Sequence, residues 1–192
     1  VGRQYEGIIR INSQSGKGGA AFIMEQDYGI SMPKAMQPVF GNLVKEAADK
    51  AQRELQPAEI FDVFENTWIK TKSPLNIIEI SERHLEGERG SNVPEQVATM
   101  LTVEWNGKRY AIAANGNGPL DAFVSAMKQT PAPKFNITSF HEHSVGTGSD
   151  TYAMSYVQIT KEDGSQVWGV GKSSNVGRAG IAAVVSALNF KG

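Results

Sequence analysis

Residues 97–128, VATMLTVEWNGKRYAIAANGNGPLDAFVSAMK, decide the fold. Two runs rich in apolar residues flank Asn106-Gly107, and the second run ends in glycines before Pro119 opens a helix-like segment. An Asn-Gly pair between such runs is typical of a β-hairpin, because glycine reaches the positive φ that the turn needs. The stretch therefore predicts part of a β-β-β-α unit. Its strands are expected at 75–83, 97–105 and 109–114, and its helix at 119–128.

The same plan recurs in the next 60 or so residues, which predict strands at 135–143, 151–160 and 166–171 and a helix at 176–188. Asp163-Gly164 takes the place of the first hairpin turn, and Val124-Ser-Ala126 is echoed by Val185-Ser-Ala187 at what we expect to be matching places in the two helices. One such unit is too small to bury its own sheet face. We therefore expect the two units to pack together or against a partner chain.

The first third of the chain has a different pattern of apolar residues, which predicts helices as well as strands. Residues 7–11 predict a strand, 12–19 a glycine-rich turn and 20–24 a second short strand. Apolar residues then recur at helical spacing from Pro33 to about Arg53, and Pro57 opens another short helix. We predict an α+β protein with a small αβ linker subdomain at 1–67, followed by two pseudo-symmetric β-β-β-α units at 68–130 and 131–192.

Composition excludes several classes of function. With 19 basic and 20 acidic residues and a formal net charge of -1, the chain has no overall field that would draw nucleic acid or an anionic membrane. It has no cysteine, hence no disulfide, thiolate nucleophile or cysteine-ligated metal. No apolar run approaches the roughly 20 residues that span a bilayer, and we expect a cytoplasmic protein. The chain begins at Val1 without a methionine, and we expect it to be part of a longer protein.

Two motifs favour a structural interpretation over a functional one. The segment 13–19 suggests a phosphate-binding loop, but Lys17 is followed by Gly18 where a serine or threonine should hold magnesium. His141 and His143 would share one face of a strand and could chelate a metal, yet Asp150 is the only further ligand nearby. Structural or solvent-facing histidines are the more common case. We find no catalytic residues, no metal ligands and no cofactor site in the pattern.

The best site candidate is the segment 115–121, where a strand ends in two glycines and Pro119 starts a helix. The free amides at such a helix start suit a carboxylate, although an ordinary tight turn would look the same. The segment 172–176 precedes the second helix and offers serine hydroxyls for capping. Two such helix starts brought together would form a small pocket suited to an amino acid. The loop 146–150 would either close over that pocket or be only a turn.

Several segments of the chain together resemble a known family. Segments 9–19, 116–120, Glu142-His143 before the glycine loop, 168–171 and 184–187 look like the part of α-isopropylmalate synthase that follows its catalytic barrel, in the same order and over essentially the whole chain. The resemblance implies a parent acyltransferase that condenses acetyl-CoA with 2-oxoisovalerate in leucine biosynthesis, using a divalent metal in a TIM barrel. This chain would be the non-catalytic, homodimeric regulatory part, without a cofactor of its own, and L-leucine would be its feedback inhibitor.

The resemblance also places the leucine pocket. The helix-end amides and short polar groups would hold the charged end of the amino acid, and Leu120 and Val176 would form an apolar wall. Phe140 stands where tyrosine is expected, and Ser144, Thr151 and Asp121 stand where alanine is common. The effector residues are predicted to be Gly116, Asn117, Gly118, Leu120, Asp121, Phe140, Ser144, Thr151, Ala153 and Val176.

Two alternatives stay open. The chain could serve mainly as a dimerisation module with a weak or lost leucine response, as the altered pocket positions suggest. It could also be the regulatory part of a related citramalate synthase-like enzyme that answers to isoleucine, because the position of one methyl group changes the binding free energy by only about 1 kcal/mol in such a pocket.

Overall fold

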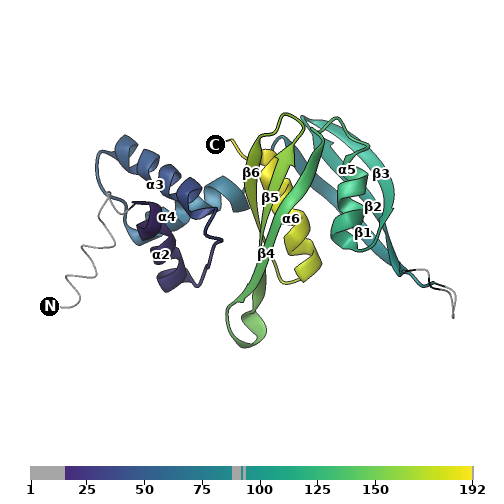
Figure 1. Ribbon diagram of the computed structural model, residues 1–192, viewed down its shortest axis with the longest axis horizontal. Helices are drawn as coiled ribbons and strands as arrows, with labels where there is room; N and C mark the ends of the chain where they lie inside the picture. The colour runs from purple at the N-terminus through teal and green to yellow at the C-terminus, as the bar shows by residue number, and fades with distance from the viewer. Residues whose placement is uncertain (1–15, 88–91, 93, 192) are drawn as a thin grey trace.

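The computed structural model describes residues 16–87, 92 and 94–191 (Figure 1). Its helices and strands follow the two-repeat plan. In chain order they are α2 (Gly16–Tyr28), α3 (Gln37–Ala51), α4 (Pro57–Phe64), a π-helical segment (Glu65–Ile69), β1 (Leu75–Leu85), β2 (Gln96–Trp105), β3 (Lys108–Gly116), α5 (Pro119–Met127), β4 (Phe135–Val145), a short 3-10 turn (Gly148–Asp150), β5 (Tyr152–Lys161), β6 (Gln166–Ser173) and α6 (Val176–Asn189).

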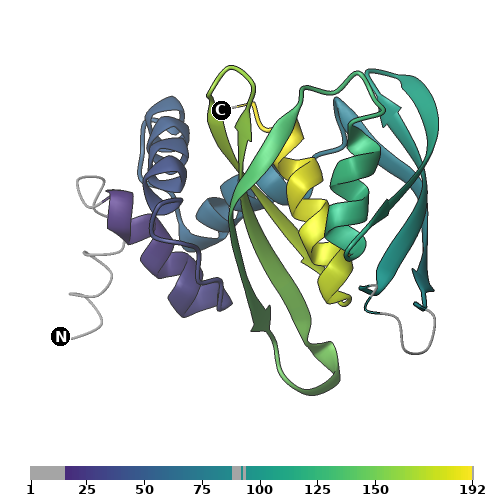
Figure 2. The same ribbon diagram turned by 45° about the vertical axis from the view of Figure 1, so that its right-hand side comes forward.

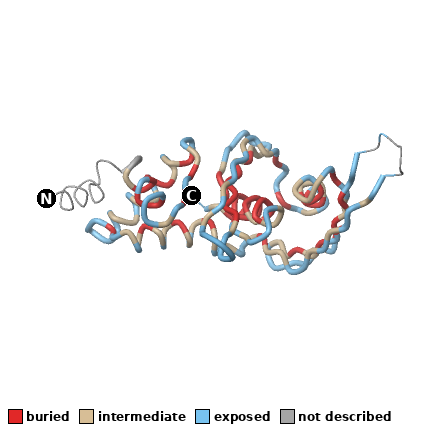
Figure 3. Tube along the Cα trace, turned by 90° about the horizontal axis from the view of Figure 1, so that it is seen from below, coloured by how far each residue is buried: buried red, intermediate tan, exposed pale blue. Residues whose placement is uncertain are grey.

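The strands form two antiparallel sheets, which we call sheet A (β1-β2-β3) and sheet B (β4-β5-β6). Helices α5 and α6 lie between the two sheets, as Figure 2 shows. Apolar residues of both sheets and both helices, including Leu101, Phe123, Val157 and Val184, form one buried core there. Figure 3 shows buried positions gathered where these layers face one another. The predicted α+β class and the two β-β-β-α units are confirmed.

The two units match in detail. Asn106 and Gly107 adopt φ values of 49° and 82°, and Gly164 adopts 82°, so both predicted hairpin turns are confirmed. Each first strand also carries a register shift near its start, between Ile77 and Glu79 in β1 and between Ile137 and Ser139 in β4. Such an extra residue is a β-bulge. Because the bulges fall at equivalent places, they support the internal repeat independently of the similar sequence segments in the two units.

The predicted correspondence between Val124-Ser-Ala126 in α5 and Val185-Ser-Ala187 in α6 is wrong. Val124 lies five residues after Pro119, the first residue of α5, and Val185 lies nine residues after Val176, the first residue of α6. The two Val-Ser-Ala segments therefore differ by four residues, about one helical turn.

Helix α6 approaches sheet B unusually closely because β6 presents glycines to it. A Cβ atom at Gly169 would lie 2.0 Å from the Ala183 carbonyl oxygen, and one at Gly171 would lie 2.0 Å from that of Ala179. Both obstacles are backbone atoms, which cannot rotate away as a side chain can. These two glycines therefore fix how near the helix lies to the sheet.

The N-terminal helices cover the opposite face of sheet B. Met154, Tyr156, Trp168 and Val170 point from that sheet into a second core shared with α2, α3 and α4. Trp68, in the π-helical segment, is buried in this core, and its indole Nε1–H donates to the Trp168 carbonyl oxygen at 3.1 Å. The N-terminal helices are therefore packed onto sheet B as a fourth layer, after sheet A, the α5 and α6 layer and sheet B itself.

The sequence-based expectation for this region needs two corrections. Residues 20–24, predicted as a strand after a glycine-rich turn, belong to α2, which already includes Gly16 to Gly19. Ala20, Ala21, Ile23 and Met24 are buried while Phe22 is 47% exposed, a pattern that fits one face of a helix. Short apolar runs do not distinguish strand from helix.

The other predictions for the first third of the chain concern two helices and one strand. The helix predicted from Pro33 begins at Gln37, with Pro38 in its first turn and Pro33 in the preceding turn. The helix predicted at Pro57 is confirmed. The strand predicted at 7–11 lies outside the described residues. The subdomain boundaries at 67 and 130 remain predictions. In the described part of the chain, no helix combines the length and apolar character needed to cross a membrane.

Candidate functional site

The starts of α5 and α6 meet between the two sheets, as the repeat predicts. A Cβ atom at Gly177, the second residue of α6, would lie 3.5 Å from Cγ of Pro119, the first residue of α5. The first amides of a helix have no partner within it and carry its positive dipole end. The fold therefore places two sources of free backbone donors in contact.

The two helix starts differ in how they are capped. At α6 the Asn175 side-chain oxygen accepts from the Arg178 amide at 3.1 Å, so the cap is Asn175 rather than the predicted serines. The Ser173 hydroxyl instead accepts from the Asn175 amide. At α5 the capping position is Gly118, which has no side chain to offer. The amides at the start of α5 are therefore the better donors for an external anion.

Asp121 takes part in shaping the α5 start. Its Oδ2 accepts a hydrogen bond of 2.8 Å from the Asn117 amide, which closes the loop between β3 and α5. This bond uses one of the amides that the sequence assigned to a ligand. It also fixes a carboxylate beside the helix start, where it supplies a negative charge.

Gly116 and Gly118 have different roles in this loop. A Cβ atom at Gly116 would lie 2.3 Å from the Ala122 backbone nitrogen, so the approach of β3 to α5 requires glycine there. At Gly118 no heavy atom of the residues that the structure describes lies within 4 Å of a Cβ, and the backbone is extended with φ of -170°. The fold thus requires glycine at Gly116. Gly118 tolerates a side chain, so a substitution there can test ligand binding without disturbing the fold.

An apolar surface adjoins the helix starts. A Cβ atom at Gly180 of α6 would lie 3.5 Å from Phe140 Cε2 and 3.7 Å from Leu120 Cδ2, so these side chains converge on the same turn of α6. Phe140 is 45% exposed and Val176 is 57% exposed, which is unusual for large apolar side chains. Leu120, Phe140 and Val176 therefore offer an accessible apolar surface beside free backbone donors.

The predicted residues on the β4–β5 hairpin are divided between two environments. Ser144 pairs with Ala153, and both lie on the face of sheet B that carries Phe140, because residues two apart on a strand share a face. Thr151 instead donates its hydroxyl to the Gly148 carbonyl oxygen at 2.8 Å, inside its own turn. The helix starts and the Phe140 face are thus brought together, while Thr151 serves the loop. Which of the ten residues touch a ligand remains a prediction.

Sequence reasoning missed two glutamates near these helix starts. The Ser155 hydroxyl donates to Glu142 Oε2 at 3.3 Å on sheet B. On sheet A, Glu82 Oε1 is buried and has no hydrogen-bond partner in the described part of the chain, and Arg178 Nε lies 3.8 Å from it. Aligning the predicted first strands of the two units, which start at Leu75 and Phe135, makes Glu82 equivalent to Glu142, and the strand pairing makes Thr99 equivalent to Ser155. That alignment was the signal that would have revealed them.

His141 and His143 share one face of β4, as predicted, and they point away from the helix starts. His141 Nε2 lies 3.2 Å from the Ser139 hydroxyl, and His143 Nε2 lies 2.7 Å from the Tyr156 hydroxyl. Within residues 16–87, 92 and 94–191, no three histidine, cysteine, aspartate or glutamate side chains gather as metal ligands do. The two histidines therefore have structural partners.

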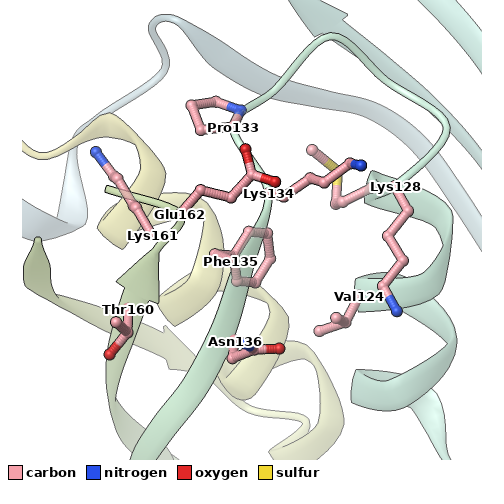
Figure 4. Close-up of a pocket in the computed structure, with 10 residues that line it drawn as sticks. Val124, Lys128, Pro133, Lys134, Phe135, Asn136, Thr160, Lys161 and Glu162 are labelled. Atoms are coloured by element: carbon pink, nitrogen blue, oxygen red, sulfur yellow. The ribbon is translucent and has the colours of Figure 1, made fainter. Parts of the chain in front are cut away.

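A cavity of about 550 Å³ lies at the other end of α5 (Figure 4). Its floor includes Phe135, and Lys128, Lys134 and Lys161 stand around it. Lysines near the C-terminal end of a helix complement its dipole, which accounts for Lys128 without a ligand. None of the predicted effector residues lines this cavity, so it is separate from the helix starts.

Comparison with known proteins gives two family matches. The model described as the LeuA allosteric (dimerisation) domain matches residues 54–191. A second model, described as the α-isopropylmalate synthase post-catalytic domain-like family, matches residues 1–25.

Three similar curated proteins are each named 2-isopropylmalate synthase. The 2-isopropylmalate synthase of Clostridium acetobutylicum is 41% identical over 98% of this chain and 33% of its own length. Those of Brucella suis and Mycobacterium leprae are 38% and 35% identical over 98% of this chain and 33% and 30% of their own lengths. The chain thus spans about a third of the relatives that it matches.

Proposed function

The chain belongs to the LeuA allosteric (dimerisation) domain family, and on that premise we propose that it is the regulatory part of a 2-isopropylmalate synthase. In this proposal it binds L-leucine as a feedback inhibitor and forms a homodimer. The catalytic TIM barrel would belong to the rest of a longer chain, and residues 1–192 would do no chemistry themselves. The protein would work in leucine biosynthesis in the cytoplasm.

The observation that carries the proposal is the contact between the starts of α5 and α6 beside the exposed surface of Leu120, Phe140 and Val176. A free amino acid has a carboxylate, an ammonium group and a side chain that must be accommodated together. The uncapped amides at the start of α5 suit the carboxylate. Asp121 suits the ammonium group, and burial of an isobutyl side chain on the apolar surface contributes about 1.5–3 kcal/mol.

Inhibition then requires a difference in affinity between two states of the enzyme. Leucine that binds one state more tightly shifts the population toward it, and such couplings are typically about 1–3 kcal/mol. A two-fold symmetric dimer would present the same surface twice. The exposed apolar side chains at the helix starts would then be shared between effector and partner chain.

Calorimetric titration of the chain with L-leucine tests the proposal, with L-isoleucine and L-valine as competing ligands. We expect saturable binding that prefers leucine. Gly118→Val should weaken leucine binding about tenfold or more, because it places a branched side chain at the uncapped helix start, equivalent to about 1.4 kcal/mol. Its thermal unfolding should match that of the wild type, since Gly118 has open space around it.

Lys128→Ala, at the lysine-rich cavity, is the matched control and should leave leucine affinity unchanged. Tighter binding of isoleucine would favour the citramalate synthase-like alternative. A folded dimer that binds none of the three amino acids would favour the purely dimerising role. Equal leucine affinity in the wild type and Gly118→Val would contradict the placement of the site.

A further inference from the structure

Strand β4 has two faces that serve different parts of the molecule. Phe140 and Ser144 lie on the face toward α6, where the effector is proposed to bind. His141 and His143 lie on the opposite face, toward the N-terminal helices. His143 forms part of a three-residue contact that we call the β4 joint, made of the His143 imidazole, the Tyr156 hydroxyl and the Ser31 backbone amide.

The hydrogen bonds of the β4 joint define the state of His143. The Ser31 amide donates to Nε2 at 3.3 Å, so Nε2 acts as an acceptor. Tyr156 is fully buried, and burial raises the pKa of its hydroxyl, which therefore keeps its proton and donates to the same nitrogen. The imidazole proton then lies on Nδ1, which donates to the Ser144 carbonyl oxygen at 3.3 Å. One imidazole ring thus links residues 31, 144 and 156.

The segment that carries Ser31 is held firmly against sheet B. Ile30 and Met32, on either side of it, are 2% and 5% exposed and belong to the core that includes Tyr156 and Trp168. A Cβ atom at Gly29 would lie 3.6 Å from Val145 Cγ1 at the end of β4. Because Ile30 and Met32 are packed into the core that contains Tyr156, a displacement of the His143–Tyr156 pair is passed to this segment.

Strand β4 is also freer to shift than β6, the other edge of sheet B. Among the strands of the described residues it pairs with β5 alone, and its bulge at Ile137 and Ser139 interrupts that ladder. By contrast, β6 is pressed directly against α6 through Gly169 and Gly171. A ligand that contacts Phe140 or Ser144 therefore acts on the more adjustable strand.

We propose that β4 transmits effector binding to the N-terminal helices through the β4 joint. Occupation of the Phe140 and Ser144 face repositions His143 on the reverse face, and the Ser31 contact changes with it. This inference rests on the proposed leucine site and adds to it a specific route, since Ser31 and His143 are 112 residues apart in the chain. His143 is in this view a positioning residue that need not touch the ligand.

Amide hydrogen exchange of the complete chain, with and without saturating L-leucine, tests the route. In the wild type we expect leucine to change the exchange rate of the Ser31 amide by about 5-fold or more, the lower end of typical allosteric couplings. His143→Phe keeps a ring of similar size and removes the acceptor. It should bind leucine within about twofold of the wild type while the response at Ser31 disappears.

His141→Phe is the matched control because it lies on the same face of the same strand, with its ring nitrogen bonded to Ser139 on that strand. It should keep the response at Ser31. Tyr156→Phe removes only the hydroxyl and should reduce the response, which gives a second variant if His143→Phe does not fold.

Two results overturn the route: a wild type that binds leucine without any change at Ser31, or a His143→Phe protein that keeps the full change. Failure of the wild type to bind leucine at all, measured by calorimetry, would instead remove the proposed site and the route with it.

Discussion

The contact between α6 and β6 predicts a severe effect of adding a single methyl group at Gly169. A Cβ atom there would lie 2.0 Å from the Ala183 carbonyl oxygen and 2.3 Å from the Ala187 amide nitrogen. Ordinary van der Waals contact begins at about 3.4 Å, so the helix or the strand must move by more than about 1 Å. Because the opposing atoms are backbone, the shift disturbs the packing of α6 along its length.

We expect Gly169→Ala to lower the free energy of unfolding by about 3 kcal/mol, the upper part of the usual range for overpacked cores. For a chain of this size that corresponds to a fall in the unfolding midpoint of about 6–12 °C. Circular dichroism during heating measures it. Gly118→Ala is the control, because its Cβ meets open space and its backbone is already extended, and it should stay within about 0.5 kcal/mol of the wild type. A Gly169→Ala midpoint equal to that of the control would refute the close approach.

Three further predictions follow from individual contacts. Asn189→Ala removes two buried hydrogen bonds of 2.8 Å, to the amide and to the carbonyl oxygen of Leu75, and should cost about 3 kcal/mol in urea unfolding. A cost under about 1 kcal/mol would mean that water replaces them. Trp68→Phe keeps an aromatic ring but loses the bond to the Trp168 carbonyl oxygen, and should cost about 2 kcal/mol by the same measurement, whereas an unchanged midpoint would contradict the bond. The side-chain hydrogen bond from Arg53 lowers the pKa of Glu59 to about 2 from its ordinary 4.5, with a smaller contribution from the Gln56 amide. Because the folded pKa is the lower one, the stabilisation is present above pH 4.5 and is lost as the pH falls toward 2. Arg53→Gln should raise the Glu59 pKa, measured by carboxyl NMR titration, and an unmoved titration would contradict the pairing.

The repeat architecture was predictable because its signals are local. Strand-like runs on either side of Asn106-Gly107 and Asp163-Gly164 marked the hairpins, and Pro119 marked a helix start. The bulges at Ile77 and Ile137 were missed because an extra residue in a strand leaves no distinct residue type behind. Residues 20–24 were assigned to a strand because five residues are too few to separate the two periodicities.

The candidate site was predictable in outline and not in detail. The meeting of the two helix starts followed from pseudo-symmetry. The need for glycine at Gly116 and the convergence of Leu120 and Phe140 on Gly180 depend on tertiary contacts that no local pattern encodes. The same holds for His143, whose partners Ser31 and Tyr156 come from different elements. Sequence reasoning thus predicted the meeting of the two helix starts but not the contacts around it, and the binding role of these residues stays a prediction.

The strongest test of the proposed leucine site is a map of backbone amide chemical shifts during titration of the chain with L-leucine. We predict that the largest changes fall on the starts of α5 and α6, at residues 117–121 and 176–178, and that smaller changes extend along β4 to His143 and across to Ser31. Saturating changes confined to the lysine-rich cavity near Lys128, or no changes on a folded chain, would contradict the site.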